Sequence, residues 1–162
     1  MNERIKQLIL DRFIQTKSSP NHVIDDRILY HNIVPKLNPK EQDELEPTIN
    51  GMQDEGIITI ENRSGSECLV LTKAGYDKIY PIDEDDAIEK IGQLILDRFA
   101  KTNSKVGHMV NDRWLGFELL EQLNPKEQDL IEIAVNKLIA DDYVEFGNKG
   151  IVLTQGGFDK IY

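Results

Sequence analysis

The stretch Ile5-Lys-Gln-Leu-Ile-Leu-Asp-Arg-Phe13 returns 86 positions later as Ile91-Gly-Gln-Leu-Ile-Leu-Asp-Arg-Phe99. The same spacing relates Asn38-Pro-Lys-Glu-Gln-Asp43 to Asn124-Pro-Lys-Glu-Gln-Asp129. Self-similarity over a long period marks a duplicated structural unit. A period of about 80 residues is too long for a solenoid repeat and long enough for a small domain. The sequence therefore predicts two similar domains in tandem.

The two copies differ in length near their ends. Leu71-Thr-Lys-Ala-Gly75 returns as Leu153-Thr-Gln-Gly-Gly157 only 82 positions later, so the second copy lacks four residues before this point. Loops tolerate deletions that packed elements do not, and we expect a surface loop there. We assign residues 1–82 to the first domain, residues 83–86 to an acidic linker and residues 87–162 to the second domain.

Local signals predict the same elements in each copy. Apolar residues at helical spacing predict a first helix, and in the second copy Asp86 is expected to cap it with Glu89 completing a capping box. Short apolar stretches at residues 22–24 and 108–110 fit a first strand. Further helix caps are expected at Asp25, Asn38, Thr72, Asn111, Asn124 and Thr154. Gly56 is expected to end the third helix of the first copy, and the apolar runs that follow the third helix predict a two-stranded hairpin in both copies.

The third helix of each copy also has a predicted inward face. Its members are Leu45, Ile49 and Met52 in the first copy, and Ile131, Val135 and Leu138 in the second. Pro47 falls within this helix of the first copy and is expected to kink it or to lift its amino-terminal half away, because proline lacks the backbone N–H and crowds the preceding turn.

Three helices with a tight turn before the third, followed by a hairpin and Leu-Thr-x-x-Gly at residues 71–75 and 153–157, resemble the winged-helix fold, a helix-turn-helix variant. The resemblance covers nearly all of both halves. It implies an α+β, mainly helical chain of two tandem winged-helix domains, each with three helices, a small β-hairpin wing and a short C-terminal helix. In such proteins the third helix enters the major groove of DNA and the wing contacts its backbone.

Charge argues against nucleic acid as the partner. The chain carries 29 acidic and 19 basic residues, a net charge of −10, and the excess of acids is present in both halves. An acidic field repels phosphate backbones. Asp43, Asp54 and Asp129 fall on the expected groove-facing side of the third helices. The residues left for a DNA-binding alternative are Lys40, Asn50, Arg63, Lys126, Asn136, Lys137 and Lys149.

The second copy replaces polar positions with apolar ones. Leu130 stands where the first copy has Glu44, and Ile133 stands where it has Pro47. We expect these two to make an outer helix face apolar, which favours a protein partner. Trp114 and Phe117, on the second helix, either extend that surface or fill the core of their own domain.

The sequence offers no signal for catalysis or for a cofactor. His22, His31 and His108 have no metal-ligand spacing, and the equivalent His22 and His108 are expected to make local hydrogen bonds. No phosphate-binding glycine loop or nucleophile elbow is found. Cys68, in an apolar strand, is interpreted as a small buried residue.

No apolar run is long enough for a membrane span and no signal-peptide core follows Met1, so we expect a cytoplasmic protein with no membrane partner. The favoured hypothesis is a non-enzymatic protein-interaction or assembly module that binds a protein partner or a second copy of itself. The alternative is a winged-helix DNA-binding transcriptional regulator.

Overall fold

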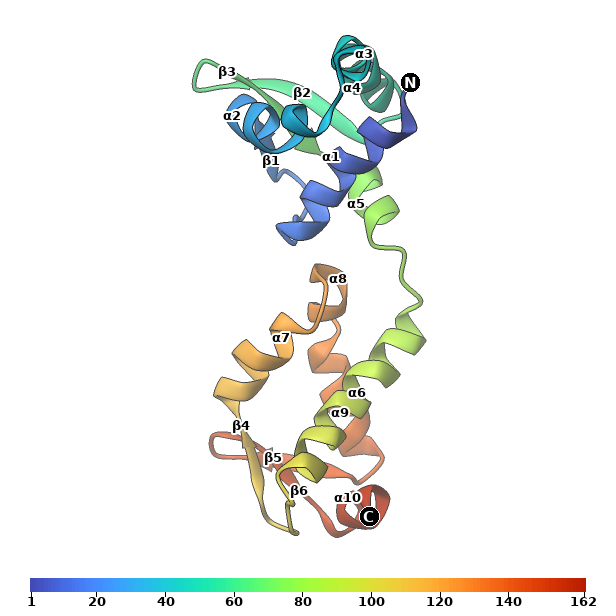
Figure 1. Cartoon of the computed structure of the whole chain (residues 1–162). Helices are drawn as coiled ribbons and strands as arrows, with labels where there is room; N and C mark the ends of the chain where they lie inside the picture. Colours follow the sequence, from blue (N-terminus) through green and yellow to red (C-terminus); the bar gives the residue numbers. More distant parts are fainter. The chain divides into compact units, whose positions relative to one another are not determined.

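The computed structural model describes residues 1–162 and divides into two compact units, Met1–Pro81 and Ile82–Tyr162. The chain is α+β and mainly helical, and each unit contains one small three-stranded antiparallel sheet (Figure 1). No helix is both long enough and apolar enough to cross a membrane.

The first unit begins with a long helix and ends with a short one. Its elements are α1 (Glu3–Gln15), β1 (Val23–Asp25), α2 (Asp26–Ile28), the π-helical segment η1 (Leu29–Ile33), the 3-10 segment η2 (Val34–Lys36), α3 (Pro39–Asp43), α4 (Leu45–Asp54), β2 (Ile58–Arg63), β3 (Ser66–Leu71) and α5 (Lys73–Ile79).

The second unit repeats this order. Its elements are α6 (Glu84–Lys101), β4 (Met109–Asn111), the π-helical segment η3 (Trp114–Glu118), α7 (Leu119–Glu121), α8 (Pro125–Gln128), α9 (Ile131–Ala140), β5 (Val144–Gly147), β6 (Gly150–Leu153) and α10 (Gln155–Ile161). A π-helical segment therefore recurs at nearly the same place in both copies.

The predicted hairpins form, and the short first strand joins each of them. The strand orders are β1-β3-β2 and β4-β6-β5, so the second hairpin strand is central in both sheets. The expectation that the four missing residues fall in a loop is wrong. Arg63 pairs with Ser66 and Gly147 pairs with Gly150, so both hairpins close over two residues, and the deletion shortens each strand from six residues to four. Two residues next to the turn can be removed from each strand without changing how the remaining residues pair.

Most of the predicted caps are confirmed. Asn38 and Asn124 each accept the backbone N–H of the glutamate three residues later, and that glutamate returns a bond to the asparagine N–H, completing a capping box. Thr72 and Thr154 accept the N–H groups of Gly75 and Gly157. These bonds satisfy N–H groups that the first helical turn leaves without partners.

One cap was predicted incorrectly. Asp83, not Asp86, caps α6 by accepting the Asp86 N–H at 3.0 Å, so the acidic stretch assigned to a linker lies in the first helical turn. Glu84, Asp85 and Asp86 are favourable there because the amino-terminal end of a helix carries partial positive charge. Asp83 and Asp86 are both competent caps, and the earlier one is used.

The third helix is divided in both units. Glu44 separates α3 from α4, and Asp129 and Leu130 separate α8 from α9. The amino-terminal part of the helix is separated at Glu44, just before Pro47, in line with the predicted effect of this proline, and Pro47 itself lies in the first turn of α4, where a backbone N–H has no helical partner. The second copy has the same break with Ile133 in place of the proline. Sequence shared by the copies therefore sets the break.

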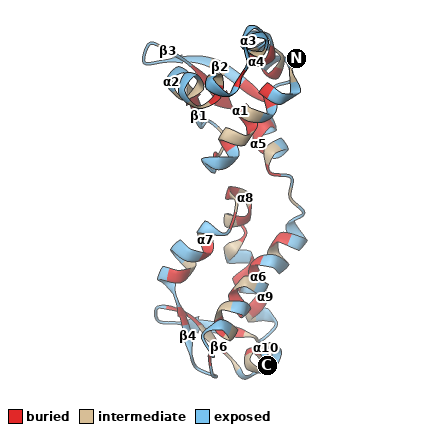
Figure 2. Cartoon of the chain, in the orientation of Figure 1, coloured by how far each residue is buried: buried red, intermediate tan, exposed pale blue.

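Each unit has its own hydrophobic core (Figure 2). In the first unit Ile5, Ile9 and Phe13 on α1 are fully buried against the sheet and α4, and in the second unit Ile91, Ile95 and Phe99 on α6 repeat this packing. Leu45 and Ile131, predicted to be buried, are only partly covered. Cys68 is buried, as predicted.

Candidate functional site

A groove of 550 Å³ opens in the first unit between η1, the α3–α4 segment and the sheet. Its floor is a row of apolar residues that crosses all three strands. Ile24 on β1 pairs with Leu69 on β3, which in turn pairs with Ile60 on β2. Directly paired residues face the same side of a sheet, so the three side chains form one continuous apolar strip.

The strip extends beyond the covering helices. Ile58 and Ile60 share a face of β2 because side chains alternate along a strand. Ile58 is completely buried, whereas Ile60, two residues nearer the hairpin turn, is only partly covered. Leu29 from η1 and Leu45 from α4 are also partly covered and complete the apolar walls.

The rim of this groove is acidic. Asp26, Glu46 and Glu67 line it, and no lysine or arginine does. None of these three carboxylates forms an ion pair in the structure. The groove therefore combines an apolar floor with uncompensated negative charge, which suits a ligand that carries apolar and positively charged groups together.

The second unit repeats the apolar strip with a larger outer member. Val110 pairs with Ile151, and Ile151 pairs with Phe146. Phe146 occupies the position of Ile60, and 69% of it is exposed. Leu115 and Ile131, the counterparts of Leu29 and Leu45, are again partly covered. The apolar strip of the second unit therefore ends on an exposed phenylalanine.

Two of the four predicted partner-binding residues lie in the core. Trp114 and Leu130 are only 6% and 8% exposed, so the expectation that Leu130 makes an outer face apolar is wrong. The break before α9 changes the direction in which position 130 points, and the leucine packs into its own unit. Phe117 and Ile133 are 69% and 51% exposed and remain candidates for partner contact.

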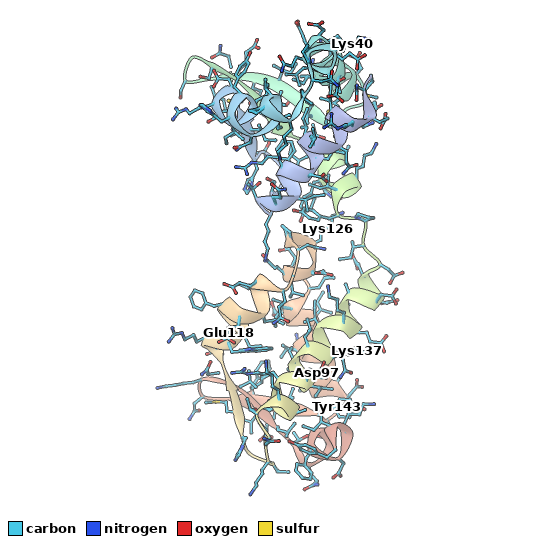
Figure 3. All side chains as sticks on the ribbon, in the orientation of Figure 1. Lys40, Asp97, Glu118, Lys126, Lys137 and Tyr143 are labelled. Carbon is cyan, nitrogen blue, oxygen red and sulfur yellow. The ribbon has the colours of Figure 1, made fainter.

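The residues of the DNA-binding alternative are distributed over several elements of the two units. Lys40, Asn50, Asn136, Lys137 and Lys149 are exposed on α3, α4, α9 and a hairpin turn, and Figure 3 marks Lys40, Lys126 and Lys137 on their helices. Arg63 is ion-paired with Glu61, whose Oε2 lies 2.8 Å from Arg63 Nη2. Asn50 lines the acidic groove. Exposed Asp43, Glu46 and Asp54 lie on the same helical segment as Lys40 and Asn50.

The predicted local hydrogen bonds of two histidines are present. His22 Nδ1 accepts the Ser19 N–H, and His108 Nδ1 accepts the Lys105 N–H, both at 3.2 Å. No three His, Cys, Asp or Glu side chains come together where they could hold a metal ion. No protein-family model, curated protein or solved structure matches this chain.

Sequence reasoning missed the groove residues Leu29 and Ile60 and their exposed counterpart Phe146. The alternation in residues 57–60 indicated a strand, but a strand pattern does not tell how far the helices cover it. The usable signal was the replacement of Ile60 by Phe146 between the copies, because an apolar residue retained near a hairpin turn marks the core-facing side of the sheet.

Proposed function

We propose that this chain is a non-enzymatic tandem winged-helix protein that acts as a protein-interaction module, and that the apolar groove of its first unit and the equivalent apolar strip of its second unit receive a partner segment carrying basic residues. The observation that carries the proposal is the apolar strip ending at Ile60 or Phe146, with acids along the rim of the first groove. The order of three helical segments and a hairpin, with the first strand added to the hairpin, agrees with the winged-helix resemblance.

Burial of the exposed apolar groups supplies the driving force. Covering one large apolar side chain stabilises a complex by about 1.5–3 kcal/mol before the costs of association. Leu29, Leu45 and Ile60 offer three partly covered side chains in the first unit, and Phe146 is the most exposed of their counterparts in the second. An apolar helix face of a partner fits a groove of this kind, with contacts three or four residues apart.

Charge selects the partner chemistry. Asp26, Glu46 and Glu67 favour lysine or arginine flanking the apolar face of the partner, because complementary charge raises association rates and disfavours acidic competitors. The same acids disfavour docking of a second copy of this chain, whose net charge is −10. They equally disfavour the DNA-binding alternative.

A labelled helical peptide with leucine on one face and lysine on the other provides the probe, and the same peptide with glutamate in place of lysine is its control. Binding to the full chain is measured by fluorescence anisotropy at about 150 mM salt, where the Debye length is about 8 Å. We expect micromolar binding of the leucine–lysine peptide and much weaker binding of the leucine–glutamate peptide.

The variants separate the groove from general charge attraction. Ile60→Asp combined with Phe146→Asp is expected to weaken binding about tenfold, equivalent to about 1.4 kcal/mol. Thr59→Asp adds the same kind of charge on the opposite face of β2 and is expected to leave binding unchanged. Circular dichroism checks that each variant is folded. Equal binding by the groove variant and the Thr59→Asp control contradicts the proposal, as does salt-sensitive micromolar binding of a DNA duplex.

A further inference from the structure

The repeated arginines Arg12 and Arg98 have different surroundings in the two units. On α6, the guanidinium carbon of Arg98 lies 5.5 Å from the centre of the Trp114 ring. Its Nη1 atom also lies 4.0 Å from Glu118 Oε2. The second unit thus supplies both an aromatic face and a carboxylate to this cation.

The first unit supplies neither partner. At the positions of Trp114 and Glu118 the first copy has Ile28 and Asn32. Arg12 forms no ion pair, and its Nε atom is buried without a hydrogen-bond partner. A buried donor without a partner is costly, because it has lost water without gaining another acceptor. The duplication therefore retains a cation on α1 whose internal partners are missing.

A cavity of 330 Å³ opens beside Arg12 between α1 and the η1–η2 segment. His31 and Lys36 also line it, where the second copy has Phe117 and Gln122. Asp11 is the only carboxylate in the lining, and its Oδ1 accepts a hydrogen bond from Gln7 Nε2 at 2.7 Å. Basic groups thus outnumber acids in this cavity, although the chain as a whole is strongly acidic.

We propose that this cavity binds a small ligand through an oxyanion group, a phosphate monoester or a carboxylate, with Arg12 as the main contact. A guanidinium presents a planar fork of N–H donors that matches two oxygens of either group. Lys36 and His31 add positive or donor groups, and the side-chain amides of Gln15 and Asn32, which line the same cavity, are further donors. The volume lies at the lower end of small-molecule sites, about 300–1,000 Å³, so it has room for an organic group attached to the oxyanion.

The site shares no lining residue with the apolar groove. Its test is a titration of the full chain with sodium phosphate, phenyl phosphate, sodium acetate or sodium chloride at matched ionic strength. The readout is the nuclear magnetic resonance signal of the Arg12 Nε–H group together with the surrounding backbone amides. We expect saturable chemical-shift changes with phosphate or acetate and none with chloride. If phosphate monoesters are the ligands, phenyl phosphate should bind more tightly than acetate. If carboxylates are the ligands, acetate should bind more tightly than phosphate.

Two variants and one matched control make the test specific. Arg12→Gln is expected to weaken oxyanion binding at least tenfold, whereas Arg98→Gln in the second unit leaves it unchanged. Asn32→Glu places a carboxylate where Glu118 stands in the second copy, and we expect it to abolish oxyanion binding while the melting temperature stays the same or rises. That variant separates lost binding from lost folding.

Three outcomes overturn the proposal. The first is the absence of saturable shifts with any oxyanion. The second is equal loss of binding in Arg12→Gln and Arg98→Gln, which would assign the effect to general charge. The third is a response of these residues to a DNA duplex without any response to the small ions.

Discussion

The Lys6 ammonium lies 2.6 Å from Glu55 Oε2, and only 8% of the Lys6 side chain is exposed. The pair joins α1 to the residue that follows α4, and Lys78 Nζ lies 3.9 Å from the same carboxylate oxygen. The hydrogen bond that the Lys6 ammonium donates to Glu55 lowers the pKa of Glu55 and raises the pKa of Lys6. The second copy has Gly92 and Asp141 at these positions and therefore lacks this ion pair.

The first unit should lose stability in acid through this pair. Because the pKa of Glu55 is lowered by folding, its stabilising contribution is present above the unfolded value of about 4.3 and is lost as the pH falls below it, where the unfolded chain binds more protons. Folding raises the pKa of Lys6, so the stabilising contribution of its positive charge is fully present until the pH exceeds the ordinary lysine value of about 10.4.

Urea unfolding of the full chain at neutral and acid pH measures this effect. Lys6→Met should lower stability at neutral pH and reduce the loss on acidification, whereas Lys73→Met, which removes an exposed pair with Asp77, should change little. An acid dependence that is the same in Lys6→Met and in the unaltered chain would show that the pair does not contribute to it.

Gly92→Ala should stabilise the second unit by about 1 kcal/mol, since glycine inside a helix costs about that much relative to alanine. A Cβ at this position would lie 3.5 Å from Leu138 Cδ2, an ordinary van der Waals contact, and Gly92 lines a cavity of 210 Å³. Thermal and urea unfolding check the result. A lower unfolding midpoint would mean that the helix α6 needs glycine for a reason other than packing against α9.

Gly75→Ala and Gly157→Ala should each destabilise the chain, by about 1–3 kcal/mol or more. An added Cβ would lie 2.1 Å from the Ile57 carbonyl oxygen at Gly75 and 2.0 Å from the Tyr143 carbonyl oxygen at Gly157. This close approach explains the glycine of the Leu-Thr-x-x-Gly signature. Gly116→Ala, where a Cβ meets nothing within 4 Å, is the control and should leave the unfolding midpoint unchanged or slightly higher.

Substitution should destabilise the second unit at Leu130 but not at Ile133, although both residues replace polar or turn-forming residues of the first copy. Leu130→Ala is expected to cost about 2–5 kcal/mol because it removes core packing. Ile133→Asp is expected to leave the second unit folded, because half of this side chain is already exposed. Melting curves followed by circular dichroism distinguish the two. If Ile133→Asp unfolds the unit, that residue belongs to the core and not to a contact surface.

Local signals in the sequence determined much of the secondary structure. The caps at Asn38, Asn124, Thr72 and Thr154 form as predicted, because the cap side chain and the backbone N–H that donates to it are three residues apart and need no distant partner. The hairpin strands and the duplication were also readable from the sequence, since apolar runs and repeated segments are properties of the chain alone.

Only the tertiary structure decided which apolar residues are covered. The break before α9 turns Leu130 into the core, and helical periodicity cannot foresee such a change of phase. Likewise, the pairing of Ile24, Leu69 and Ile60 across three strands depends on register between segments distant in sequence. Burial is a property of neighbours brought together by folding, so the apolar groove and the unpartnered Arg12 could be found only once those neighbours were in place.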